Sequence, residues 1–153
     1  MKLLITILSF FICLQLSAGC KKNTEMTSNH NNALNTDSIK LKITIGTNTF
    51  SASLSDNTTA AAFKEMLPIT INMSELNGNE KYVDFSKNLP SNASNPGTIQ
   101  TGDLMLYGAN TLVLFYKTFS TPYNYTRIGR IDNPSGLAAA LGSGNKTVKF
   151  ELD

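Results

Sequence analysis

The stretch that decides the fold is residues 96–131, PGTIQTGDLMLYGANTLVLFYKTFSTPYNYTRIGRI. Residues 104–107 form a short apolar run between two glycine-containing turns, and such turns commonly bound strands. The next run, residues 112–116, is apolar without interruption, which predicts a central strand covered on both faces. Residues 125–131 show the period of two that is typical of a strand with two unlike faces. The stretch therefore predicts three adjacent antiparallel strands.

Strands are also predicted at the two ends of the apolar pattern. Apolar and polar residues alternate over residues 39–45 and, beyond a turn, over residues 50–54, which predicts a hairpin. Val148, Phe150 and Leu152 alternate in the same way and predict a last strand. Because the chain ends of small domains tend to lie close together, we expect the last strand near the first.

Two short helices are predicted between the strands. The first follows capping residues at 56–58, presents Phe63 and Leu67 to the core and ends at Pro68. The second is LAAAL at residues 137–141, which glycines bound on both sides.

A second hairpin turns at Asn77-Gly78, and an irregular loop with two prolines spans residues 89–97. Loops of this kind often frame binding sites. The total is about eight strands and two short helices over residues 39–153, and a mainly β set of this size most readily closes into a small barrel.

The composition indicates one ordinary globular domain, since 41% of residues are hydrophobic and 16% are charged. From residue 39 onward, ten basic residues face nine acidic ones. Nucleic-acid binding needs many cations on one face, so we expect no nucleic-acid partner. Nothing in the sequence indicates an oligomeric state.

The N-terminus has the form of an export signal. A lysine and an apolar core over residues 3–16 precede the small residues Ser17-Ala18-Gly19 and then Cys20. Residues 17–20 resemble the bacterial lipobox, with Ser17 in place of the usual leucine. This resemblance implies a signal peptide at 1–19, lipid on Cys20 and a location in the bacterial cell envelope. The alternative is an ordinary secretory signal that leaves Cys20 as a free thiol.

Residues 20–38 are mostly polar and show no apolar period, which predicts a flexible tether between the lipid and the domain. The single histidine, His30, falls in this segment. From residue 39 onward there is neither histidine nor cysteine, so a Ser-His-Asp or Cys-His mechanism and the usual zinc sites cannot be assembled there. We therefore expect no metal and no cofactor.

The domain contains enough acidic residues for the catalytic carboxylate pair of a glycosidase, although their spacing in the sequence does not indicate which two would form it. The four acids in question are Glu75, Glu80, Asp84 and Asp103.

Three segments resemble the bacterial cyclophilin-like fold proteins: TAAAFKEMLPITINM, GTIQTGDLMLYG and IGRID. Together they extend the resemblance over nearly all of residues 39–153. It implies a closed barrel that carries a ligand cleft on its side. It also leaves two functions open, a non-catalytic module that binds a peptide or small molecule and a peptidyl-prolyl isomerase with substituted residues.

A comparison with the isomerising cyclophilins implies that Gln100 corresponds to their glutamine that contacts the substrate. It also implies that Tyr116 and Tyr125 occupy positions that line their substrate pocket. The arginine that weakens the prolyl amide is replaced by Asn92, and the pocket phenylalanine by Gly97. Isomerisation has a barrier of about 18–20 kcal/mol, and lowering it needs a fixed donor, so binding without catalysis is favoured.

Tyr82 and three other tyrosines supply apolar area with polar tips, and two arginines of the last central strand lie within reach of the same cleft. The candidate ligand-binding residues are Gln100, Tyr107, Tyr116, Tyr125, Arg127 and Arg130.

Overall fold

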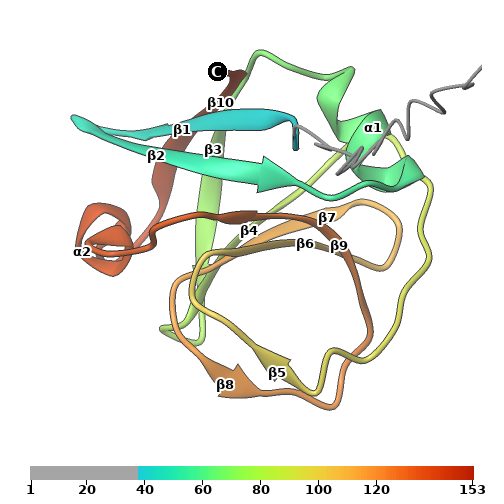
Figure 1. Cartoon of the computed structure of the whole chain (residues 1–153). Helices are drawn as coiled ribbons and strands as arrows, with labels where there is room; N and C mark the ends of the chain where they lie inside the picture. The colour runs from blue at the N-terminus through green and yellow to red at the C-terminus, as the bar shows by residue number, and fades with distance from the viewer. Residues whose placement is uncertain (1–37) are drawn as a thin grey trace, which may run out of the picture. The chain divides into compact units, whose positions relative to one another are not determined.

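The computed structural model describes residues 38–153 and shows a closed antiparallel barrel with a small second sheet packed against its outside (Figure 1). Eight strands follow one another around the barrel in the order β1-β10-β3-β4-β7-β6-β9-β2, and β5 pairs with β8. This confirms the predicted mainly β barrel of about eight strands with two short helices. The elements are β1 (Lys40–Ile45), β2 (Asn48–Leu54), α1 (Thr58–Lys64), β3 (Ile69–Leu76), β4 (Glu80–Asp84), β5 (Thr98–Ile99), β6 (Asp103–Tyr107), β7 (Thr111–Phe115), β8 (Phe119–Ser120), β9 (Tyr125–Ile131), α2 (Leu137–Leu141) and β10 (Lys146–Leu152).

The predicted signal peptide at 1–19, the lipid site at Cys20, His30 and almost all of the predicted tether lie outside the described residues. Within residues 38–153, no helix is both long enough and apolar enough to cross a membrane.

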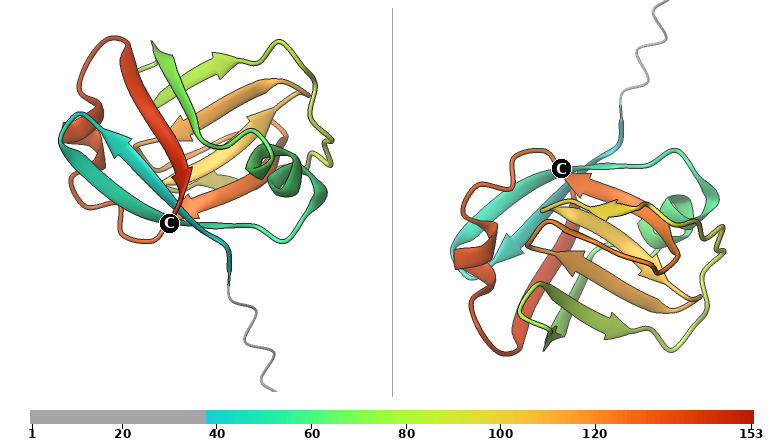
Figure 2. Two further views of the ribbon diagram at one scale, coloured as in Figure 1. Left: turned by 90° about the horizontal axis from the view of Figure 1, so that it is seen from above. Right: turned by 90° about the horizontal axis from the view of Figure 1, so that it is seen from below.

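The first and last strands are neighbours, as the sequence predicts. Leu41 of β1 faces Ala52 of β2 on one side and Leu152 of β10 on the other, so β1 closes the barrel between them (Figure 2). Leu41 and Ile43 point inward and are fully buried. The alternation in the sequence therefore corresponds to one face in the core and one in water.

β7 is buried on both faces, which confirms the interpretation of its uninterrupted apolar run. Leu112 and Leu114 belong to the main core inside the barrel. Val113 and Phe115 belong to a second apolar cluster on the outside, together with Ile99 of β5. The small β5–β8 sheet thus covers part of the outer face of β6 and β7, including Val113 and Phe115, and removes these side chains from water.

Both helices attach to the main core through the predicted residues. The Asn57 side chain caps α1 by accepting a hydrogen bond from the Ala60 backbone N–H at 2.8 Å. Phe63 is fully buried and meets Phe150 edge to face, with ring centroids 5.7 Å apart. The helix ends at Lys64, earlier than predicted, so Leu67 lies beyond it and is only partly buried against the core. In α2, Leu137 and Leu141 are both buried in the same core.

β9 departs from the predicted strict alternation because it contains a β-bulge. Arg127 and Gly129 pair with consecutive residues of β6, so Ile128 between them has no partner on that strand. The insertion shifts the phase of the strand by one residue, and Arg127 and Arg130 are both exposed instead of lying on opposite faces. At Gly129 a Cβ atom would come within 2.6 Å of the Ser53 carbonyl oxygen, so β9 and β2 approach each other too closely for a larger residue.

The candidate functional site

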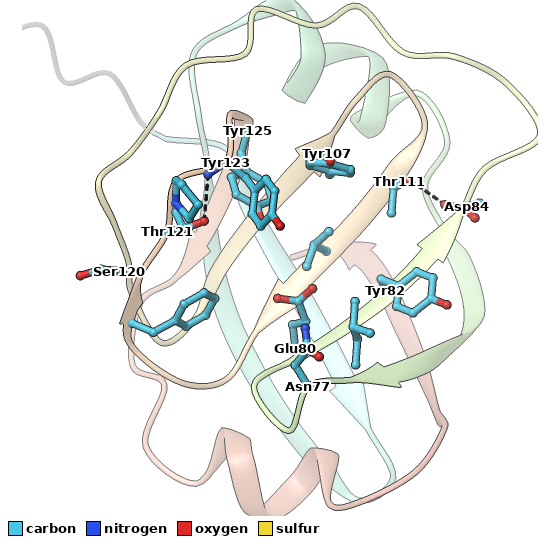
Figure 3. A pocket seen from close by; sticks show the side chains of 14 residues that line it. Asn77, Glu80, Tyr82, Asp84, Tyr107, Thr111, Ser120, Thr121, Tyr123 and Tyr125 are labelled. Atoms are coloured by element: carbon cyan, nitrogen blue, oxygen red, sulfur yellow. Dashed lines mark hydrogen bonds between the residues drawn. The ribbon is translucent and has the colours of Figure 1, made fainter.

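A pocket of about 550 Å³ opens on the outside of the barrel, beside the β5–β8 sheet (Figure 3). Its base is formed by the outward-facing side chains of β4, β6 and β7, and its rim by residues 119–125. We call it the Glu80 pocket. It is lined by Leu76, Asn77, Glu80, Tyr82, Asp84, Tyr107, Thr111, Val113, Phe119, Ser120, Thr121, Pro122, Tyr123 and Tyr125.

The period of two in β4 places three of these side chains on one face. Glu80, Tyr82 and Asp84 occupy alternate positions, so all three point outward, while Lys81 points into the barrel. Asp84 accepts a hydrogen bond of 2.6 Å from the Thr111 hydroxyl on β7. One acidic side chain of the pocket is therefore held by a neighbouring strand.

Tyrosine rings form much of the pocket wall. The ring of Tyr107 lies edge to face with Tyr123 at 6.1 Å and tilted against Tyr125 at 5.5 Å, measured between centroids. Tyr125 in turn meets Phe115 of the outer cluster edge to face at 5.5 Å. These geometries are those that aromatic pairs prefer, so the wall is packed as a unit.

Glu80 lies at the base of the pocket and is only 8% exposed. Within residues 38–153 its carboxylate has no hydrogen-bond or ion-pair partner, and Figure 3 shows it pointing into the pocket beneath the tyrosines. Burial, together with the nearby negative charge of Glu75, raises the pKa of Glu80 to about 7. The carboxyl group is therefore poised to change charge near neutral pH.

The rim of the pocket is fixed by backbone hydrogen bonds. The Thr121 N–H donates to the Gly97 carbonyl at 3.0 Å, and the Thr121 hydroxyl accepts from the Tyr123 N–H at 3.2 Å. The loop between β8 and β9 is thus anchored to the loop before β5.

A separate polar cluster lies on the other face of the β3–β4 hairpin, inside one end of the barrel. The fully buried Lys81 pairs with Glu75, and its ammonium donates to the carbonyls of Gly142 at 2.9 Å and Gly144 at 2.6 Å. Tyr116 donates from its hydroxyl to Glu75 at 2.6 Å. These contacts join the hairpin to the loop after α2.

Glu75 and Tyr116 of this cluster both have shifted pKa values. Burial alone would raise the pKa of Glu75, but the hydrogen bonds from Lys81 and Tyr116 outweigh burial and hold that pKa below its usual value. Burial and the hydrogen bond to Glu75 raise the pKa of Tyr116. The cluster therefore keeps a carboxylate and a neutral phenol at neutral pH.

The two arginines of β9 belong to a third group of polar side chains, which surrounds Asp103. Asp103 is fully buried and accepts hydrogen bonds from the Arg127 guanidinium at 2.6 Å and from the Gln100 backbone N–H at 2.9 Å. The Arg130 Nε atom lies 3.7 Å from the same carboxylate. Arg127 also borders a second hollow, of about 510 Å³, together with Tyr125.

Two of the six sequence candidates, Tyr107 and Tyr125, come together in the Glu80 pocket. The structure places the others elsewhere: Tyr116 beside Glu75, and Gln100, Arg127 and Arg130 around Asp103.

Sequence reasoning singled out neither Tyr123 nor Phe119, and it left Glu80 as one of four interchangeable acids. The alternation of Glu80 with Tyr82 in β4 was the one signal that could have placed this acid beside an aromatic wall. Within the described part of the chain, no group of three metal-ligating side chains occurs.

The chain belongs to the Cyclophilin-like family, whose model matches residues 43–151. Its structure is similar to the solution structure of the hypothetical protein AF2241 from Archaeoglobus fulgidus, with a TM-score of 0.52 and 21% sequence identity. That similarity covers 76% of this chain and 95% of the other, and it shows a shared fold. A comparison with curated proteins finds no match.

Proposed function

We propose that this protein is an exported binding module that holds a peptide or small molecule in the Glu80 pocket without changing it chemically. The observation that carries the proposal is the combination of a packed aromatic wall with a largely buried carboxylate that has no hydrogen-bond or ion-pair partner in residues 38–153. Binding sites typically combine apolar walls with a few convergent polar groups. Removing most of a carboxyl group from water disfavours its charged form, and a bound ligand of suitable charge would offset that cost.

Catalysis is the weaker alternative. A prolyl isomerase must direct a fixed donor at the prolyl amide, but the lining of the Glu80 pocket contains no arginine, lysine or histidine. Arg127, which borders the neighbouring hollow, is already paired with Asp103. We therefore expect the protein to bind without accelerating X-Pro isomerisation.

The proposal is tested by protein-observed NMR with three probes of different character: phenol, choline chloride and a succinylated Ala-Ala-Pro-Phe anilide. We expect at least one of them, at millimolar concentration, to shift the amide resonances of Tyr82, Tyr107 and Tyr123, and a Tyr107→Leu variant to weaken that effect. If all three probes leave these resonances unmoved, the binding proposal fails.

The same anilide serves in a coupled isomerisation assay. Activity above background that falls in Gln100→Ala or Arg130→Ala would replace the binding proposal with the isomerase alternative.

We further propose that the module is tethered to a membrane of the bacterial cell envelope by lipid on Cys20, with residues 20–38 as the spacer. The support is the signal-like segment that precedes this cysteine. In a bacterial expression host, Cys20→Ala should move the protein out of the membrane fraction. An unchanged distribution between the membrane and soluble fractions would refute the tethering, and Cys13→Ala is the matched control.

A further inference from the structure

The ionisable acids and bases that line the Glu80 pocket are all acidic. Its lining contains two acids, Glu80 and Asp84, and no basic side chain. Asp84 is exposed at the mouth and already accepts a hydrogen bond from Thr111, whereas Glu80 at the base is more than nine-tenths buried and has no partner in residues 38–153. An anionic ligand would be repelled by both groups. A neutral apolar ligand would remove Glu80 from its remaining water without offering it a charge.

The pocket wall favours positive charge for an independent reason. The faces of aromatic rings attract cations, and the wall presents Tyr82, Tyr107, Tyr123 and Tyr125 around the space above Glu80 (Figure 3). A volume of about 550 Å³ also exceeds what a single small inorganic ion would fill. An organic cation combines a charge for Glu80 with apolar surface for the rings.

From these contacts we infer that the pocket binds an alkylammonium group, with the nitrogen beside the Glu80 carboxylate and its carbon substituents against the tyrosine rings. The inference rests on the proposed binding function and names the chemical class of its ligand. The group comes either from a free amine or from a lysine side chain of a peptide, since both present the same chemistry.

Binding of a cation should depend on pH with a definite sign. The titratable groups around Glu80 come from several elements: Glu75 of β3, Tyr107 of β6, Tyr116 directly after β7, Tyr123 of the rim, Tyr125 of β9, and Tyr82 and Asp84 of its own strand. Burial raises the pKa of both Tyr116 and Tyr125, so these phenols stay neutral and Glu80 is the group that changes charge near neutral pH. Affinity for an ammonium should therefore increase as pH rises through about 7.

The test is an NMR titration of the full chain with matched pairs of probes. Choline is compared with 3,3-dimethylbutan-1-ol, a neutral molecule of the same shape. Nα-acetyl-lysine methylamide is compared with its Nε-acetylated derivative, which lacks the charge. We expect each cation to bind at least about tenfold more tightly than its neutral match, the scale of one charge-assisted contact. A third comparison, of butylamine with the lysine derivative, tells a free amine from a peptide side chain, because both probes carry the same primary ammonium.

Three variants accompany the titration. Glu80→Gln should reduce choline affinity by about tenfold or more and abolish its increase with pH, while leaving the affinity for the neutral alcohol unchanged. Tyr107→Leu removes one ring from an exposed position and should weaken choline binding more than alcohol binding. Glu65→Gln, which removes an exposed acid next to α1, controls for long-range charge and should change neither affinity.

The inference is overturned if the neutral match binds as tightly as the cation, or if Glu80→Gln leaves choline affinity unchanged. If no ammonium shifts the pocket resonances but phenol or the proline-containing anilide does, the ligand class is wrong and the proposed binding function stands. If no probe shifts them, both fail.

Discussion

Glu80 gives the folded protein a pH dependence of stability opposite in sign to that of Glu75, whose pKa is lowered. Its carboxyl group has a usual pKa of 4.5, and burial together with Glu75 raises that pKa to about 7 in the folded chain. Between these values the unfolded chain releases the proton while the folded chain keeps it. This group therefore lowers the free energy of unfolding progressively from about pH 4.5 to about pH 7, and the loss remains at higher pH.

We predict that Glu80→Gln removes this decrease, because an amide resembles the protonated carboxyl and carries no charge. Above pH 7 the variant should be more stable than the native protein, by on the order of 2 kcal/mol. Urea unfolding on either side of this pH range measures the change, with Glu65→Gln as the exposed control. A variant whose stability still falls with pH as the native protein's does would contradict the assignment.

Lys81 is the second residue whose role can be measured directly. Lys81→Met would leave Glu75 without its cation and two carbonyl groups, those of Gly142 and Gly144, without a donor. We expect the free energy of unfolding to fall by about 3 kcal/mol, the usual effect of breaking a buried ion pair. Lys42→Met, which breaks a pair with Glu151 at the surface, is the matched control and should cost much less. Equal losses in the two variants would show that the Lys81 cluster does not hold the hairpin.

At the scale of elements, the β5–β8 sheet is the part that turns an ordinary barrel face into a pocket. It is tied to the barrel through Ile99, which is fully buried against Phe115 and its neighbours, while the adjacent Thr98 is exposed. Ile99→Ala should destabilise the protein by about 2 to 4 kcal/mol, as core truncations do, and should increase amide hydrogen exchange at Thr121 on the pocket rim. Thr98→Ala should leave both quantities nearly unchanged. The sheet would be only a surface feature if the two variants behaved alike.

At the scale of the whole molecule, the barrel closes through pairing of its first strand with its last. β1 pairs with both β2 and β10, and the Asp153 N–H donates to the Lys40 carbonyl at 3.2 Å, so the last and first strands complete each other. We predict that a protein beginning at Ile39 folds alone and melts within a few degrees of the longer chain, because residues 39–153 carry the complete apolar pattern. Thermal unfolding followed by circular dichroism tests this. An unfolded or insoluble product would show that the preceding residues are required.

The local patterns of the sequence determined the elements and the barrel. The predicted strands and helices follow from patterns that extend over only a few neighbouring residues. These patterns are the alternation in residues 39–45 and 148–152, the continuous apolar run of β7 and the capping residue Asn57. The closing partners β1 and β10 were also predictable, since chain ends tend to meet. These features depend on periodicity and turn chemistry, which a single sequence displays.

Only the tertiary structure decided the site. The bulge at Ile128 set both arginines of β9 on one side of Asp103, and no alternation in the sequence marks an inserted residue. Tyr116 and Tyr125 looked equivalent as pocket aromatics, yet one faces into the barrel and the other outward. The pocket brings Glu80 of β4 together with Tyr107 of β6 and Tyr125 of β9. The distance between such strands depends on the order in which the barrel closes. That order is set by packing between residues remote in sequence, so a pattern of near neighbours does not contain it.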